Sequence, residues 1–270
     1  MLINGLQGDT VSIHDRGLLY GDGVFRTLRV HDGRVLNWQR HYKKLQQDSA
    51  ALGIVCPESA LLSDELQRLI EQQPDAIAKI IITRGQQAAR GYAPIASTIP
   101  TRILSLAPLP SYPADFYTQG VRLRICELRL GHQPKLAGIK HLNRLENVLA
   151  AAEWSDADIA EGVLLDVAGN VIEGTRSNLF MVRDGALLTP DLSQCGVAGV
   201  QRDRVLEWAT EHGMSCQIGQ FTLAQLLEAD EVFMVNSIIG LWPVRELQGH
   251  TWSQHPIALQ VQKWLNHAPD

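Results

Sequence analysis

Lys140 is the residue whose surroundings first suggest covalent chemistry. It lies in the stretch PKLAGIKHLNRLE (residues 134–146), after a glycine-containing turn and at the start of a predicted helix over residues 141–154. The N-terminal end of a helix favours anions, so a lysine there is either solvated or an amine that is used in its neutral form. A neutral amine forms a Schiff base with an aldehyde. Most lysines are surface residues, but the apolar neighbours on both sides of Lys140 favour partial burial.

Two later segments carry residue types that suit a cofactor or an anion. Glu173 lies near the end of a predicted strand in NVIEGTRSNLF (residues 170–180), where it is either a solvated carboxylate or one held against a cofactor. In CGVAGVQR (residues 195–202), two glycines lead into a predicted helix. Backbone N–H groups at such a helix start can bind phosphate, although the spacing matches neither GxGxxG nor a P-loop. Taken alone, each segment is also compatible with a purely structural role.

A fourth segment, DRGLLYGDGVFRT (residues 15–27), enters a predicted strand through a glycine turn, and HYKKL (residues 41–45) follows it. Arg26 and Thr27 must point to opposite faces of the strand, because side chains alternate, so one of them can line a cavity. The sequence has no GxSxG, HExxH or EF-hand pattern, and its nine histidines do not cluster. We therefore predict neither serine hydrolysis nor a metal site.

The elements that must position these residues are a mixture of helices and short strands. Tight turns separate many of the strands, which predicts an α+β (mixed α/β) fold with two domains rather than a doubly wound parallel sheet. The proline-rich stretch APLPSYPA (residues 107–114) cannot be a regular helix or a central strand. We expect a small N-terminal α+β domain over residues 1–106, a linker over residues 107–118 and a larger C-terminal α+β domain over residues 119–270.

Composition narrows the class of protein. The 270 residues are 45% hydrophobic and carry a formal net charge of -5, without a basic block, which makes general nucleic-acid binding a poor candidate. The four cysteines are widely scattered and form no CxxC pair, as is usual for reduced thiols. We see no signal peptide and no apolar run of membrane-spanning length. The expectation is a soluble cytoplasmic protein that binds neither nucleic acid nor membrane.

Seven motifs occur in the order in which they are found in fold-type IV (class IV aminotransferase-like) pyridoxal phosphate enzymes. The chain resembles that family nearly from end to end, and GIKHLNRLE, RG…RGY at residues 84–92 and YGDGVFRT are most similar to the aminodeoxychorismate lyases. The motifs are YGDGVF, H-x-x-[basic]-L, RG…RGY, the lysine motif, EGxxSNLF, GVAGVQR and VNSIIGLWPV. The resemblance implies the D-amino acid aminotransferase-like architecture.

The resemblance also implies a cofactor, pyridoxal 5'-phosphate, and a role for each matching residue. Lys140 is the lysine that binds the cofactor covalently, and Glu173 binds its pyridine nitrogen. The backbone of Val200 and Gln201 and the side chain of Ser237 hold the phosphate. Lys44 stands where the family normally has arginine, so a charge is retained but a bidentate contact to phosphate is lost.

The implied reaction converts 4-amino-4-deoxychorismate to 4-aminobenzoate and pyruvate in folate biosynthesis. Lys140 removes a proton, and Thr27 assists proton transfer to the leaving group. The two carboxylates of this substrate require cationic groups, for which we expect Arg90 first and then Arg26, Arg84 and Arg144. The relatives are homodimers, so we expect a homodimer. The alternative is a class IV aminotransferase that acts on D-amino acids or branched-chain amino acids, since Lys140 and Glu173 are common to both chemistries.

Overall fold

The computed structural model describes residues 1–88, 91–95 and 98–267, and the chain divides into two compact units. The first unit contains Met1–Pro110 together with the short segment Ile139–Asn143, and the second contains Ser111–Gly138 and the described residues from Arg144 onward. The boundary after Pro110 falls within the proline-rich stretch. Both units combine helices with β-sheet, which confirms the predicted α+β class.

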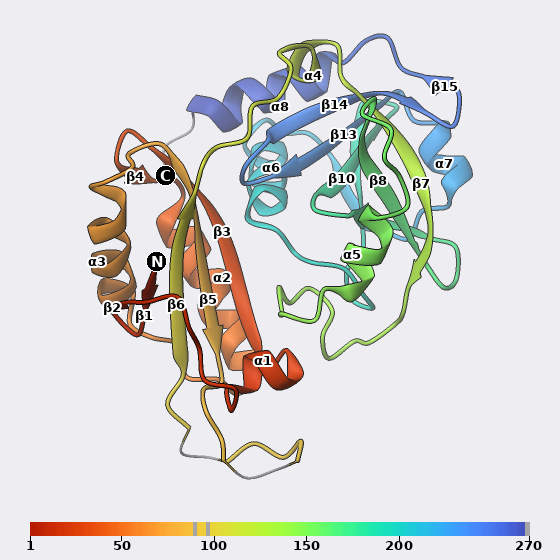
Figure 1. Cartoon of the computed structure of the whole chain (residues 1–270). Coiled ribbons are helices and arrows are strands. Elements are labelled where there is room, and N and C mark those ends of the chain that lie inside the picture. The colour runs from red at the N-terminus through yellow and green to blue at the C-terminus, as the bar shows by residue number, and fades with distance from the viewer. Residues whose placement is uncertain (89–90, 96–97, 268–270) are drawn as a thin grey trace. The chain divides into compact units, whose positions relative to one another are not determined.

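A six-stranded sheet forms the first unit (Figure 1). Its strands follow the order β2-β1-β6-β5-β3-β4. The strands are β1 (Leu2–Ile3), β2 (Leu6–Gln7), β3 (Gly23–His31), β4 (Arg34–Val35), β5 (Ala76–Thr83) and β6 (Thr101–Ala107). The central pair β3 and β5 is antiparallel, and its register runs from Gly23 opposite Thr83 to Val30 opposite Ala76. This register decides which side chains share a face with Thr27.

Helices cover one face of this sheet. They are α2 (Trp38–Ala51) and α3 (Ser59–Ile70), and a short α1 (Arg16–Tyr20) precedes β3. Leu45 of α2 and Leu62 and Leu66 of α3 are buried against alternate residues of β3 and β5. Along β3 the residues Val24, Arg26 and Leu28 are buried, while those between them are half-buried. The strand therefore has one covered face and one more open face.

The second unit is built on a nine-stranded sheet with the order β12-β11-β10-β13-β14-β7-β8-β9, and β15 pairs with β14. Its strands are β7 (Val121–Leu130), β8 (Ile159–Asp166), β9 (Val171–Gly174), β10 (Asn178–Arg183), β11 (Ala186–Pro190), β12 (Cys216–Gly219), β13 (Glu231–Asn236), β14 (Gly240–Leu247) and β15 (His250–Thr251). Strands β8, β9, β10 and β13 are buried along nearly their whole length. Strands covered on both faces show this continuous burial.

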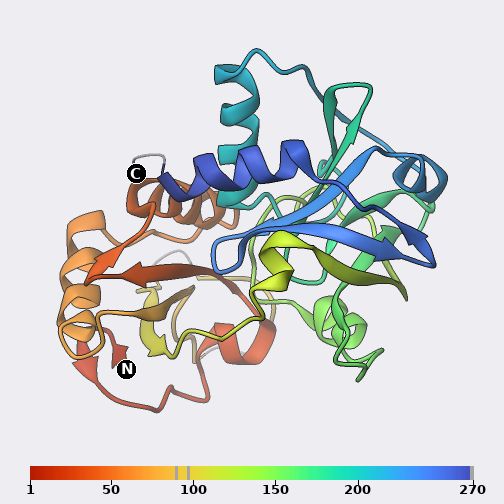
Figure 2. The ribbon, with the colours of Figure 1, turned by 90° about the horizontal axis from the view of Figure 1, so that it is seen from above.

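Both faces of the β10, β13 and β14 portion are packed. The helices of this unit are α4 (Asp115–Thr118), α5 (Leu145–Ala151), α6 (Val200–Glu211), α7 (Leu223–Leu227) and α8 (Pro256–His267). Helices α6 and α8 pack on one face (Figure 2). Trp208 of α6 and Val261 of α8 lie in the same core as Phe180 and Phe233. No helix within the described ranges is long and apolar enough to cross a membrane.

The helix predicted over residues 141–154 is wrong in its first part. Helix α5 spans only Leu145–Ala151, and His141 instead forms a β-bridge with Val24 of β3. The apolar residues at helical spacing on α5 are exposed, since Leu145 is 74% and Leu149 60% accessible. Long-range pairing with β3 thus replaces the first turn of the expected helix.

Candidate active site

Lys140 lies in an extended segment that pairs with the start of β3. Phe25 donates its N–H to the Lys140 carbonyl at 3.0 Å, and Leu142 donates to Gly23 at 2.9 Å. The Lys140 ammonium stands over the Phe25 ring, 4.5 Å from its centroid. A cation over an aromatic face is attracted by the ring quadrupole. Backbone pairing and this contact together place the amine over β3.

The expected position of Lys140 at a helix N-terminus is therefore corrected. Helix α5 begins five residues later, at Leu145, so the helix dipole supplies no argument about the charge of this amine. Lys140 is half-buried, as its apolar neighbours indicated.

Thr27 shares the more open face of β3 with Phe25, two residues away. Directly opposite Thr27 on β5 is Lys79, whose ammonium lies 5.2 Å from the centroid of the same Phe25 ring. Lysines at positions 79 and 140 thus contact one aromatic side chain. We did not single out Lys79 from the sequence, although a lone charge within the apolar strand AIAKIIIT was a usable signal.

Arg26 points to the covered face of β3, where its side chain is 2% exposed. It forms an ion pair with Asp48 of α2, and the Asp48 carboxylate also accepts the backbone N–H of Lys140 at 2.9 Å. Burial raises the pKa of the Asp48 carboxyl above its ordinary value, against the opposing charges of Arg26, Lys44 and Lys140. Arg26 is thus engaged in a buried ion pair. Asp48, like Lys79, is a residue that we did not single out from the sequence.

Lys44 lies on α2 one turn before Asp48 and is half-buried. Its charge is among those that lower the pKa of Asp48. It therefore belongs to the same group of charges as Arg26 and Lys140.

Arg84 uses its guanidinium for contacts within the first unit, and its side chain is 12% exposed. It donates to both carboxylate oxygens of Asp22, at 2.7 and 3.0 Å, and to the carbonyls of Leu52 and Gly53 at the end of α2. A guanidinium that binds one carboxylate and two carbonyls holds these segments together.

Arg90, our first choice for substrate binding, lies outside the described residues.

Glu173 is buried in the second unit, on β9. Its carboxylate accepts the N–H of Val197 at 2.9 Å and lies 3.4 Å from the side-chain amide of Asn178. Asn178 also donates to the Val197 carbonyl at 2.8 Å and accepts from Gly199 at 3.1 Å. The carboxylate is thereby bound to the loop that leads into α6.

Helix α6 begins at Val200, directly after this loop. Its N-cap Gly199 provides no side-chain cap, which leaves the first-turn N–H groups for other acceptors. A Cβ at Gly199 would lie 2.5 Å from the Asn178 side-chain oxygen, so glycine is required by close approach. The first helical residues, Val200 and Gln201, are buried. Glu173, Asn178 and the start of α6 therefore form one connected group.

The polar residues of the EGTRSN stretch are held by another carboxylate, Glu161 of β8. Glu161 accepts the hydroxyl of Ser177 at 2.9 Å, and it accepts both the N–H and the hydroxyl of Thr175. These hydroxyls therefore order the loop after Glu173. Nothing in the local sequence pattern of Glu161 indicated this role.

Ser237 lies in the turn between β13 and β14. Asn236 orders this turn by accepting the N–H groups of Ile238 and Ile239 at 2.8 and 2.9 Å. Val235 on β13 pairs with Asn178 on β10. The turn that contains Ser237 therefore follows a strand that lies next to Asn178.

Arg144, the last substrate candidate, is half-buried and is the residue before α5. Its guanidinium donates to the side chain of Asn147 at 3.5 Å.

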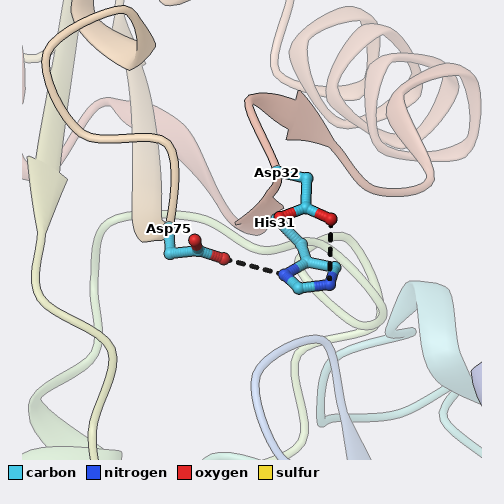
Figure 3. Close-up of side chains that lie close together, drawn as sticks. All are labelled: His31, Asp32 and Asp75. Carbon is cyan, nitrogen blue, oxygen red and sulfur yellow. Dashed lines mark hydrogen bonds and ion pairs between the residues drawn. The ribbon is translucent and has the colours of Figure 1, made fainter.

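His31, Asp32 and Asp75 lie together at the surface of the first unit (Figure 3). His31 is 2.7 Å from Asp75 and 3.7 Å from Asp32, and all three are exposed. The hydrogen bond from His31 keeps the pKa of Asp75 below its ordinary value. This contact fastens the end of β3 to the residue just before β5, and we assign it a structural role.

Comparison with known proteins defines the class to which this chain belongs. The family model of the class IV amino-transferases matches residues 23–247. The chain belongs to the class IV aminotransferase family.

Individual relatives of the chain carry more specific names than the family. The chain is 41% identical to a Vibrio harveyi protein named aminodeoxychorismate lyase, over 90% of this chain and 89% of that protein. It is 33% identical to a putative branched-chain-amino-acid aminotransferase of Methanocaldococcus jannaschii, over 88% of this chain and 83% of that protein. The crystal structure of 4-amino-4-deoxychorismate lyase from Pseudomonas aeruginosa is similar with a TM-score of 0.95 and 47% identity, over 99% of this chain and 98% of that chain.

Proposed function

We propose that this protein is a pyridoxal phosphate-dependent lyase that converts 4-amino-4-deoxychorismate to 4-aminobenzoate and pyruvate, a step of folate biosynthesis. The observation that carries the proposal is the 47% identity, over nearly the whole chain, to the Pseudomonas aeruginosa enzyme of that name. The two products together contain all atoms of the substrate, so the reaction requires no oxidant and no second substrate.

The chain carries the donor groups that pyridoxal phosphate requires. A covalent bond to its aldehyde needs an amine, its phosphate needs N–H donors, and its ring nitrogen needs a carboxylate. Lys140 supplies the amine, the uncapped start of α6 at Val200 and Gln201 supplies N–H groups, and buried Glu173 supplies the carboxylate. We assign the Ser237 hydroxyl and the Lys44 charge to the phosphate as well.

When bound, pyridoxal phosphate withdraws electrons from the carbon attached to the substrate nitrogen. Lys140 acts as the general base that removes the proton from that carbon. Thr27, on the same face of β3 as Phe25, passes a proton to the departing enolpyruvyl oxygen. Lys79, opposite Thr27, adds a positive charge for a substrate carboxylate. Of the four arginines, Arg90 and Arg144 remain our substrate ligands, since Arg26 and Arg84 are engaged with Asp48 and Asp22.

The first experiment is a product assay on purified protein supplied with pyridoxal phosphate. The substrate is made in place from chorismate and glutamine by a synthase, and 4-aminobenzoate and pyruvate are measured together. We expect equal amounts of both, abolished in Lys140→Ala. Lys135→Ala is the matched control, because Lys135 is exposed in the same segment, and it should retain activity. Normal turnover in Lys140→Ala would refute the assignment.

The similarity to a putative aminotransferase supports a second candidate function, which is amino-group transfer. Protein that forms neither product, but transfers amino groups from D-alanine or a branched-chain amino acid to 2-oxoglutarate, would be an aminotransferase. The roles of Lys140 and Glu173 would then stand.

We also propose a homodimer in the cytoplasm. Leu145, Val148 and Leu149 form an exposed apolar stripe on α5, each at least 59% accessible, and large exposed apolar patches mark interaction surfaces. The free thiols, two of them buried, suit a reducing compartment. Sedimentation equilibrium of the native protein and of Val148→Glu tests the dimer, which we expect the substitution to weaken. A native monomer would refute it.

A further inference from the structure

Asp48 lies where three segments of the first unit meet. It comes from the last turns of α2, its ion-pair partner Arg26 comes from β3, and its hydrogen-bond donor is the backbone of Lys140 in the segment Ile139–Asn143. The side chains of Asp48 and Arg26 are 7% and 2% exposed. The lysine segment is thus attached to the α2 side of the unit by one carboxylate.

We propose that Asp48, oriented by Arg26, is the positioning residue of Lys140: it fixes the backbone from which the amine projects, and its negative charge acts on that amine. The inference deepens the proposed function and rests on Lys140 being the reactive lysine. Asp48 itself contacts no substrate in this role.

The cost of burying the ion pair supports a specific role for it. A carboxylate and a guanidinium lose hydration when they are buried, and apolar residues of similar volume often give equal or greater stability. The neighbours of Arg26 on the same face, Val24 and Leu28, are apolar and fully buried. A third apolar residue would suit this face, but it would leave Asp48 without its ion-pair partner.

Three positively charged side chains, one from each of the three segments that meet at Asp48, affect its carboxyl. Burial raises the pKa of its carboxyl, and the charges of Arg26 on β3, Lys44 one turn earlier on α2 and Lys140 in the segment Ile139–Asn143 lower it. Since this coupling is mutual, the charge of Asp48 must favour the protonated form of the Lys140 amine. A general base that must take up a proton gains from such a neighbour.

The test measures the Lys140 amine in the apoprotein, so that no cofactor or substrate is involved. Trace labelling with acetic anhydride across a pH series, read by mass spectrometry, gives the midpoint at which Lys140 becomes reactive. Asp48→Asn keeps an oxygen acceptor but removes the charge. We expect its midpoint to fall, so that labelling near neutral pH is two- to tenfold faster.

A second measurement separates position from charge. Hydrogen exchange of the Lys140 amide should accelerate at least tenfold in Asp48→Ala, which has no acceptor, and much less in Asp48→Asn. Arg26→Lys should retain most of both native values, because it keeps a cation beside Asp48. Asp64→Asn, at an exposed position on α3, is the matched control and should change neither.

An unchanged labelling midpoint in folded Asp48→Asn would overturn the electrostatic part, and unchanged exchange in Asp48→Ala would overturn the positional part. If Asp48→Ala does not fold, the labelling of Asp48→Asn and Arg26→Lys still decides the proposal. The outcome is independent of the product assay: a protein that forms both products but shows native labelling in Asp48→Asn and native exchange in Asp48→Ala refutes only the positioning role. Shifted labelling in a protein that forms no 4-aminobenzoate refutes only the proposed reaction.

Discussion

Asp48 in the first unit and Glu173 in the second are buried carboxylates that each accept one backbone N–H at 2.9 Å. Asp48 holds a segment 92 residues away and is paired with a guanidinium, whereas Glu173 holds a loop 24 residues away and accepts from the amides of Val197 and Asn178. The comparison teaches that one anchor depends on a buried ion pair and the other on amide donors, the backbone of Val197 and the side chain of Asn178. Substitutions should therefore affect the two regions differently.

Removing the cation from the first region should give the largest loss of stability. Arg26→Met leaves Asp48 buried without its ion-pair partner, and breaking a buried pair from one side lowers the free energy of unfolding by about 3–5 kcal/mol. Urea unfolding followed by circular dichroism measures it. Arg122→Met, which breaks a half-exposed pair with Glu246, is the control and should cost less than about 1 kcal/mol. Equal losses of unfolding free energy in both variants would show that the anchor at Asp48 does not depend on its buried ion pair.

In the second region the charge should matter for turnover and little for folding. Glu173→Gln keeps an oxygen that can accept the Val197 N–H, so stability should change by less than about 1 kcal/mol. Turnover should fall by about two to three orders of magnitude, the usual effect of losing one preorganised electrostatic contact. Steady-state kinetics with saturating pyridoxal phosphate checks this prediction. A loss of turnover below tenfold would mean that Glu173 is only an anchor.

A smaller effect is expected where the loop bound by Glu173, which contains Val197 and Gly199, enters α6. Gly199→Ala introduces a methyl group 2.5 Å from the Asn178 oxygen, so the N-terminus of α6 must shift. We expect about a tenfold weaker affinity for pyridoxal phosphate, about 1.4 kcal/mol, measured by absorbance titration of the apoprotein. Gly131→Ala has its nearest contact at 3.8 Å and should bind the cofactor as the native protein does. Loss of affinity in both variants would contradict the role of the α6 start.

The smallest effect concerns Asp22, which sharpens the contrast with Asp48. Burial alone raises the pKa of Asp22, but Arg84 and Arg16 outweigh it, so the pKa lies below its ordinary value, opposite in direction to that of Asp48. A depressed folded pKa contributes stability above the unfolded pKa, about 4, and this contribution is lost as pH falls through the folded pKa.

Asp22→Asn should therefore be less stable than the native protein at neutral pH, by about 1 kcal/mol, and the difference should shrink below pH 4. Thermal unfolding of both proteins across this range measures it. A difference that widens toward low pH would give the wrong sign for the Asp22 pKa.

Much of the fold follows from local patterns in the sequence. The run AIAKIIIT, whose apolar and β-branched residues favour a buried strand, is strand β5 (Ala76–Thr83), and the helix expected after Gly199 is α6. These features depend on residues close in sequence, and periodicity and turn chemistry report such residues well.

Features that depend on distant partners were not predictable. The spacing of Leu142, Leu145 and Leu149 favours a helix, but Leu142 bonds to Gly23 instead, in an extended segment. Arg26 and Arg84 looked like ligands for carboxylates and do bind carboxylates, but those of Asp48 and Asp22. A single sequence shows that a charge is present without showing which distant charge neutralises it.

The chain emerges from the ribosome with its N-terminus first, and the first unit is still incomplete when residue 110 has emerged. Its last piece, Ile139–Asn143, follows only after residues 111–138 of the second unit. At about 5–20 residues per second, this delay is roughly two to seven seconds. Until then the start of β3 lacks the partner that accepts from Phe25 and donates to Asp48. The first unit can become native during synthesis only after the second has begun to be made.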